Sequence, residues 1–159
     1  MAKIFPKYNG AKLDAERTHR YYLYRIWNKE LPLLAFIGLN PSTAAEEKND
    51  PTINKIINIT NFNGYGGFYM FNLFTIVSPD PKVLHKLVDD FGYNLSIIKS
   101  ITMQLKMNIV FCWGNFETYG RDQIMKELFK DSYALGINKN GSPKHPLYLP
   151  TETKLIRYQ

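Results

Sequence analysis

Three short apolar runs, each ending in a polar turn, constrain the fold of this chain more than any other feature. The runs span residues 33–37, 68–71 and 109–112, and they lead into Gly38-Leu39-Asn40-Pro41, Asn72-Leu73-Phe74 and Trp113-Gly114. Continuous apolar runs of this length are typical of parallel strands that are buried on both faces. Because helical patterns lie between them, we expect an α/β fold: a three-layer α/β/α sandwich around a mostly parallel sheet of about four to five strands.

The remaining segments supply helices and shorter strands to this fold. Residues 20–27 are rich in strand formers and predict an early strand at an edge of the sheet. Asp50-Pro51-Thr52 predicts a helix start, because aspartate accepts backbone N–H groups at the cap and proline suits the first helical position. Further expected elements are helices through residues 83–88, 95–105 and 117–129, and short strands at 133–137 and 147–149.

The length of the chain predicts a single domain, residues 1–159. Hydrophobic residues make up 45% of the chain and charged residues 21%, which is ordinary for a soluble globular protein. No apolar run is long enough to cross a membrane, and the N-terminus lacks the apolar stretch of a secretory signal. The single cysteine, Cys112, excludes a disulfide framework. We therefore expect a monomeric cytoplasmic protein with no membrane partner.

The charge of the chain favours a polyanionic partner. Lys and Arg number 20 against 14 Asp and Glu, which gives a net charge of +6. Phosphate contacts supply most of the non-specific affinity of proteins for nucleic acid, so DNA is the expected partner. The alternative is that the charge only keeps a small protein soluble, since it is spread along the chain and not massed in one arm.

Polar side chains follow the predicted strands at the ends where ligands bind in open α/β sheets. Asn40 and Asn72 are two of them, and His145 lies in a later turn. The Asn40 amide can hold a water molecule or a base edge, but it cannot act as a general base because it does not titrate near neutral pH. The alternative reading is that Asn40 simply belongs to a strand-to-loop turn.

His145 stands in a turn that prolines and a glycine make rigid, with Lys139 and Lys144 adding positive charge nearby. A rigidly placed imidazole can donate a hydrogen bond to charge that develops on a leaving group, although a surface loop position is the alternative. Helix capping explains Asp50, and a polar role in a site is its second reading. The sequence has no metal-ligand spacing and no phosphate-binding loop, so we expect neither a metal nor a cofactor.

In their order along the chain, the motifs resemble those of a bacterial and phage family known as a domain of unknown function. That family carries LNPS, DPT, NLF, WG and HPLYL, and this chain has all five. The resemblance covers about residues 20–150 and leaves residues 1–19 as an N-terminal extension. A thinner resemblance connects the chain to the uracil-DNA glycosylase superfamily. It rests on Gly38-Leu39-Asn40-Pro41, on Asn72 after a strand, on the turn at Trp113-Gly114, and on His145-Pro146-Leu147.

The glycosylase resemblance implies a uracil-DNA-glycosylase-like fold and a role for each matching residue. Asn40 would position the attacking water, Asn72 would read the base, and His145 would stabilise the departing base. The aromatic side chain that stacks on the base would be Phe62, Tyr65 or Phe74. Contacts to DNA would come from Ser42, Lys139 and Lys144, with Leu147 and Tyr148 as an apolar wedge. Leu147 stands where the family has serine, and Asn40 implies slow hydrolysis because the uracil-specific branch has aspartate there.

The leading hypothesis is an N-glycosidase that removes a modified or mismatched nucleobase from DNA. The first alternative is an enzyme of the same fold that acts on a free nucleoside or nucleotide. The second is a non-catalytic module that binds nucleic acid or a protein and retains the site only as a pocket.

Overall fold

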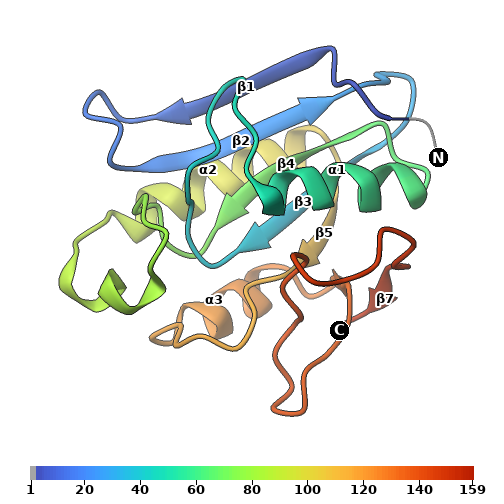
Figure 1. Cartoon of the computed structure of the whole chain (residues 1–159). Coiled ribbons are helices and arrows are strands. Elements are labelled where there is room, and N and C mark those ends of the chain that lie inside the picture. Colours follow the sequence, from blue (N-terminus) through green and yellow to red (C-terminus); the bar gives the residue numbers. More distant parts are fainter. Residues whose placement is uncertain (1–2) are drawn as a thin grey trace.

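The three apolar runs form the inner strands β3 (Leu33–Gly38), β4 (Gly67–Asn72) and β5 (Asn108–Phe111). They are seen in a computed structural model that describes residues 3–159. β3 lies between β4 and β5 and is parallel to both (Figure 1). The four β3 side chains from Leu34 to Ile37 have no exposed surface. Burial on both faces explains the unbroken apolar run, and the prediction of these three central strands is confirmed.

The complete sheet has seven strands in the order β1-β2-β4-β3-β5-β6-β7, and it is mixed. The outer strands are β1 (Tyr8–Leu13), β2 (Arg20–Ile26), β6 (Tyr133–Ala134) and β7 (Ile156–Arg157). Only the pairs within β4-β3-β5-β6 are parallel, whereas β1/β2, β2/β4 and β6/β7 are antiparallel. The expectation of a mostly parallel sheet of about four to five strands is therefore wrong. The added strands lie near the two chain ends and pair antiparallel with their neighbours, which needs no crossover helix.

β2 was expected at an edge of the sheet, but β1 occupies that edge and β2 is internal. Part of the N-terminal extension thus belongs to the sheet. The strand signal of β1 is weak because it contains Asn9 and Gly10, residue types that are depleted in strands. Gly10 leaves room for the Tyr24 ring, since a Cβ atom at this position would lie 2.5 Å from the end of that side chain and would force it to shift.

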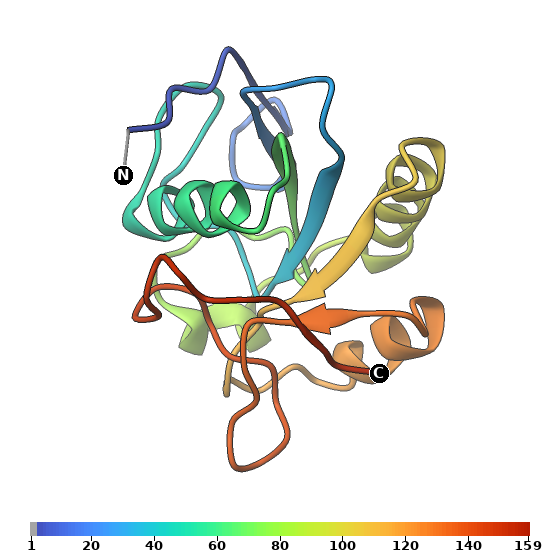
Figure 2. The ribbon, with the colours of Figure 1, turned by 90° about the vertical axis from the view of Figure 1, so that its right-hand side faces the viewer.

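Helices cover both faces of the central sheet (Figure 2). α1 (Pro51–Phe62) packs its isoleucines on one face, and α2 (Phe91–Gln104) and α3 (Arg121–Leu128) pack on the other. Asp50 caps α1 as expected, because its side chain accepts the backbone N–H of Ile53 at 2.9 Å. Among residues 3–159, no helix combines the length and the apolar character needed to cross a membrane.

Several expected elements are shorter than the sequence indicated. The helix through residues 83–88 is only a 3-10 helix, η1 (Pro81–Lys86), because Leu84 alone is buried there and Val88 is 87% exposed. α3 begins at Arg121 instead of residue 117, after Gly120 with φ +81°. The strand expected at 133–137 is reduced to the two residues of β6. Residues 147–149 form a turn instead of a strand, and β7 pairs with β6.

The order of the parallel strands places a switch point between β3 and β5. After β3 the chain passes through α1 to β4, whereas after β5 it passes through α3 to β6 on the opposite side of the sheet. The loops that follow β3 and β5 therefore diverge toward opposite faces. Ligands of open α/β sheets bind outside the carboxyl ends of the strands at such a point.

Candidate functional site

Asn40 joins the loops that follow β3 and β4. Its Nδ2 donates to the backbone oxygens of Pro41 at 3.1 Å, Ile76 at 3.1 Å and Ser78 at 2.9 Å. These bonds use the donor end of the amide and fix its orientation, which leaves Oδ1 as the atom that can hold a ligand or a water molecule. Asn40 is thus first a structural clamp, and any contact with a ligand goes through its oxygen.

Asn72 ends β4 with a buried amide that has no hydrogen-bond partner. Its side chain is 2% exposed, and neither Oδ1 nor Nδ2 is bonded to any of residues 3–159. Gly38 stands opposite in the parallel ladder and leaves room for it, since a Cβ at residue 38 would lie 2.8 Å from Asn72 Oδ1. A buried polar group without a partner costs about 1–3 kcal/mol, so this amide calls for a partner from outside the described chain, either a ligand or a water molecule.

His145 lies against the carboxyl end of β5. Gly114, with φ +78°, donates its N–H to Pro143 at 2.9 Å, and a Cβ at residue 114 would lie 3.5 Å from His145 Cβ. The His145 Nδ1 accepts the N–H of Leu147 at 3.2 Å. In the neutral imidazole the proton must therefore sit on Nε2, which becomes a hydrogen-bond donor.

Asp50 brings a negative charge to the same region. One carboxylate oxygen caps α1, and Oδ2 has no hydrogen bond within residues 3–159. Desolvation lowers the pKa of His145 although the residue as a whole is exposed, and the Asp50 carboxylate opposes that shift. At neutral pH the imidazole is thus mainly uncharged, as its hydrogen bond from Leu147 requires.

Two buried arginines of β2, which the sequence analysis missed, hold the loop between β3 and α1. Arg20 is 3% exposed and Arg25 is 1% exposed. Arg25 donates from all three guanidinium nitrogens, mainly to backbone oxygens of residues 45–48 and to Asn49 Oδ1. Arg20 donates from Nη1 to Ala44 O at 2.9 Å, and its Nε is buried without a partner in the described chain. The sequence gives no clear signal for them, because the strand that carries both was expected at an edge, where charged side chains are ordinary.

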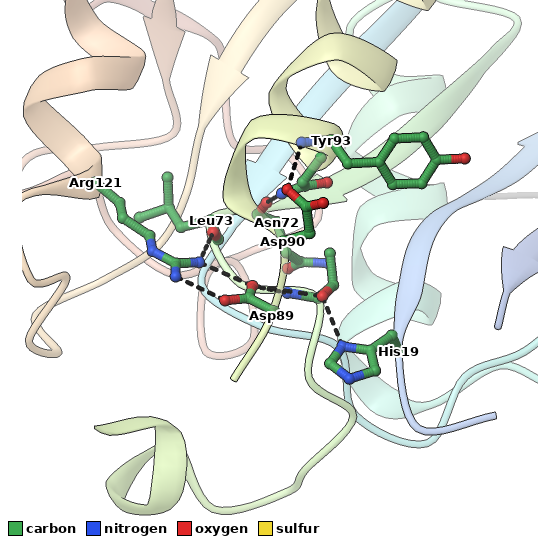
Figure 3. A network of polar contacts seen from close by, with 9 residues as sticks. His19, Asn72, Leu73, Asp89, Asp90, Tyr93 and Arg121 are labelled. Atoms are coloured by element: carbon green, nitrogen blue, oxygen red, sulfur yellow. Dashed lines mark hydrogen bonds and ion pairs between the residues drawn. The ribbon is translucent and has the colours of Figure 1, made fainter. Parts of the chain in front are cut away.

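A second polar network connects the end of β4 to α2, α3 and β2 (Figure 3). Arg121 holds the buried Asp89 carboxylate through two hydrogen bonds, at 2.8 and 2.6 Å, and also donates to Leu73 O. Asp89 accepts the N–H of Thr75 at 3.0 Å, and Thr75 Oγ1 lies 2.8 Å from His19 Nδ1. Burial alone would raise the pKa of Asp89, but Arg121 and Thr75 outweigh it and lower that pKa. The network rigidifies the segment that follows Asn72.

None of the three aromatic side chains expected to stack on a base is placed to do so. Phe74 is 3% exposed, and the Arg121 guanidinium lies 3.9 Å from its ring centre. Phe62 ends α1, which begins at the carboxyl edge of the sheet and therefore ends at the amino edge. Tyr65 lies at that amino edge as well, where its hydroxyl accepts from Asn108 at the start of β5. Phe62 and Tyr65 are thus at the wrong end of the strands, and Phe74 is already covered.

The residues expected to contact DNA differ in exposure. Tyr148 is 94% exposed and shares its turn with His145 and the half-buried Leu147. Lys139 is exposed near the tip of the preceding turn, whereas Lys144 is half-buried and packs its methylene groups over Gly136. Ser42 is half-buried at the start of the loop between β3 and α1.

A surface cavity of about 380 Å³ lies at the end of β5, lined by Trp113, Gly114 and residues of the 115–118 and 140–142 segments. Asn40, Asn72 and His145 do not line this cavity, and they do not line four further surface hollows of residues 3–159. That these three side chains share one open cleft therefore stays a prediction. Within residues 3–159, no group of three or more His, Cys, Asp or Glu side chains is arranged to hold a metal ion.

Residues 20–147 match the family model described as "Protein of unknown function (DUF1643)". The match begins at the first residue of β2 and ends two residues after His145. The chain belongs to this family. No curated protein and no solved structure matches this chain. The DUF1643 range includes Arg20, Asn40, Asp50, Asn72 and His145, and the prediction of a family of unknown function is confirmed.

Proposed function

We propose that this protein is an N-glycosidase that reads a nucleobase with Asn72 and releases it from DNA. The observation that carries the proposal is the buried Asn72 amide, whose oxygen and nitrogen both lack partners in the described chain. A carboxamide presents an acceptor beside a donor, and this pattern is complementary to the edges of several nucleobases. The position of Asn72 at the end of a parallel strand, near the switch point of the sheet, also favours a ligand there.

The proposed chemistry uses donors that are already in place. Cleavage of an N-glycosidic bond leaves negative charge on the base and positive charge on the sugar. The Asn72 Nδ2 and the His145 Nε2–H would donate to the departing base, and fixed donors of this kind are effective because they need no reorganisation. His145 suits this role as a neutral donor, because the Leu147 N–H occupies its Nδ1.

Asn40 and Asp50 would act on the water and the sugar. The Asn40 Oδ1 would orient the attacking water without accepting its proton, which would pass to the departing base or to solvent, so slow hydrolysis is expected. The Asp50 carboxylate is close enough to influence the pKa of His145. Its negative charge would favour the positive charge that develops on the sugar.

Duplex DNA as the substrate is supported by the charge and by the turn around His145. The net charge is +6, and Lys139 is exposed. Tyr148 projects from the same turn as His145 with 94% of its surface exposed. An apolar side chain beside a catalytic loop can occupy the gap that an extruded base leaves in the stack.

A free nucleoside or nucleotide is the second candidate substrate, and the depth of Asn72 favours it. A side chain that is 2% exposed suits a small ligand that can be wholly enclosed. Leu147 in place of the serine expected from the glycosylase resemblance points the same way, because a hydroxyl that would grip the DNA backbone is missing.

Base release from defined substrates tests the proposal. Oligonucleotides with uracil, thymine mismatches or modified cytosines are incubated with the protein, and abasic sites are detected by alkaline cleavage, with free nucleosides tested in parallel. Asn72→Asp, which replaces the amide donor by an acceptor, is expected to lower release at least tenfold. Asn108→Asp, at the opposite edge of the sheet, is the matched control and should leave release unchanged. Absence of release from every oligonucleotide and nucleoside would contradict the proposal.

A further inference from the structure

Two arginines of β2 are equally buried, but only one of them has its hydrogen bonds satisfied. Arg25 bonds through Nε, Nη1 and Nη2, with the Nε bond to Asn49 at 2.8 Å. The hydrogen bonds of Arg20 within residues 3–159 use Nη1 alone, and its Nε is buried without a partner. The burial of Arg25 is explained by its hydrogen bonds to the loop that it holds. Most N–H donors of Arg20 have no partner that would explain its burial in the same way.

The unused side of Arg20 is the one that binds oxyanions. The Nε and Nη2 of a guanidinium form a fork that matches two oxygens of a phosphate or a carboxylate. Arg20 makes no ion pair with a carboxylate of the described chain. Burial lowers the pKa of Arg20 to about 10, with the Asp50 charge opposing, so the group stays protonated at neutral pH. A buried charge with a free fork is costly unless an anion binds it.

Arg20 also lies at the carboxyl edge of the sheet. Its backbone N–H donates to Thr75 O at 2.8 Å, three residues after Asn72 in the chain. Its Nη1 reaches Ala44 in the loop that follows β3. The guanidinium is thus placed between the loops that leave β3 and β4, which are the loops that carry Asn40 and Asn72.

We propose that Arg20 binds a phosphate group of the substrate through its free Nε–Nη2 fork. The substrate is then a nucleotide, either free or as part of DNA, and its base is read by Asn72. The inference rests on the proposed function for the nucleobase, but phosphate binding can be measured without it. Because Arg20 is 3% exposed, the bound phosphate would lose most of its water, which strengthens its attraction to the guanidinium.

A phosphate reaches the buried Arg20 fork only if the loop of residues 40–50 moves aside, and this movement is part of the proposal. Residues 40–50 contain no helix or strand, and part of their support is the exposed ion pair between Arg17 and Glu46 at 2.8 Å. Arg17→Gln removes the same charge as Arg20→Gln and a contact to the same loop. Because the Arg17 guanidinium is exposed and already paired, Arg17→Gln is the matched control.

The first experiment follows the arginine Nε–H signals by NMR while inorganic phosphate is added to the full chain. The Arg20 signal, identified by its loss in Arg20→Lys, is expected to shift with saturation, and the Arg25 signal is expected to stay in place. An Arg20 signal that does not move at high phosphate concentration, or a shift of the Arg25 signal alone, would overturn the inference. A shift caused by a free base but not by phosphate would overturn it too, because the fork would then hold the base.

The second experiment compares a nucleoside with its monophosphate by calorimetry. Arg20→Gln is expected to weaken binding of the monophosphate about tenfold to a hundredfold and to leave nucleoside binding unchanged. Arg17→Gln should change neither affinity more than about twofold. Equal losses for both ligands in a folded Arg20→Lys variant would show that Arg20 only supports the loop. Phosphate binding by a protein that releases no base would contradict the proposed function but not this inference. Base release by a protein whose Arg20 signal does not respond to phosphate would contradict this inference but not the proposed function.

Discussion

The amide oxygen of Asn72 lies 2.8 Å from the point where a Cβ atom of residue 38 would stand. The two residues are partners in the parallel ladder of β3 and β4, so their side-chain positions lie on the same face. Glycine at residue 38 is thus the condition for a buried amide at residue 72. The glycine of the Gly38-Leu39-Asn40-Pro41 motif serves the neighbouring strand as much as its own turn.

Gly38→Ala is expected to displace the Asn72 amide. The new methyl group would also meet the end of the Met70 side chain, which can move more easily. We expect a loss of about 1–3 kcal/mol in the free energy of unfolding, measured with urea, and at least a tenfold loss of base release. Gly92→Ala in the first turn of α2 is the control, since its Cβ would make only an ordinary contact at 3.6 Å and should change the free energy of unfolding by less than about 1 kcal/mol. Unchanged release by a folded Gly38→Ala protein would contradict the role given to Asn72.

Asp89→Asn tests the network that holds the segment after Asn72. The Asp89 side chain is 1% exposed, and removal of its charge leaves Arg121 without its partner. Loss of one member of a buried pair typically costs about 3–5 kcal/mol, which urea denaturation at pH 7 would measure. An effect smaller than 1 kcal/mol would show that the pair contributes little beyond its desolvation.

The pH dependence of stability gives an independent check on the same residue. The pKa of Asp89 is lower in the folded protein than its ordinary value of 3.8. Its contribution is therefore present above that value and is lost as the pH falls through the folded pKa. The Asp89→Asn protein should show a flatter decline of stability below pH 4 than the wild type. Parallel declines would contradict a lowered pKa.

The central strands could be predicted because burial on both faces leaves an unbroken apolar run. The outer strands leave no such signal. β1 contains Asn9 and Gly10, and it is held by pairing with β2 and by the Tyr24 ring above Gly10. β6 and β7 have two residues each, and their pairing depends on chain segments more than 20 residues apart. The parallel character of the sheet was overestimated because these antiparallel pairs are set by tertiary contacts.

The positions of Asn40 and Asn72 at the ends of strands were predictable, because a turn motif marks each of them. Charged residues that act through distant partners were not predictable. Arg20 bonds to a residue 24 positions away, and Arg121 to one 32 positions away. Phe62 and Tyr65 were misplaced because sequence proximity to β4 does not tell which end of the strand a residue lies on. The direction of α1 decides that, and it carries both to the amino edge.

Asp50→Asn is expected to lower the pKa of His145 further. The Asp50 carboxylate raises this pKa against the effect of desolvation, so its removal leaves desolvation unopposed. Asparagine keeps the cap of α1, and the free energy of unfolding should change by less than about 1 kcal/mol. Titration of the imidazole C–H signals by NMR measures the shift, and the exposed His85 serves as the internal control. A His145 pKa that stays the same or rises would show that Asp50 does not act on it.

His145→Ala is expected to lower base release about a hundredfold while substrate affinity stays nearly the same, since the donor acts on charge that forms only in the transition state. Desolvation lowers the pKa of His145, so wild-type release should be level above about pH 6.5 and should fall at lower pH. The added proton on Nδ1 would break the hydrogen bond from Leu147. Release that falls as the pH rises above 6.5 would identify the imidazolium as the active form. Parallel losses of affinity and rate would make His145 a binding residue.

Salt dependence separates duplex DNA from a small nucleotide as the substrate. Each lysine contact with a DNA phosphate releases a bound cation, so affinity for a duplex should fall steeply with salt. Lys139→Gln, in the exposed turn that precedes His145, is expected to reduce the slope of log affinity against log salt by about one unit. Lys99→Gln on α2 also removes an exposed charge and should leave the slope unchanged. Fluorescence titration of a labelled duplex at several salt concentrations measures both slopes. A flat response in the wild type, together with tight binding of a free nucleotide, would assign the site to the smaller ligand.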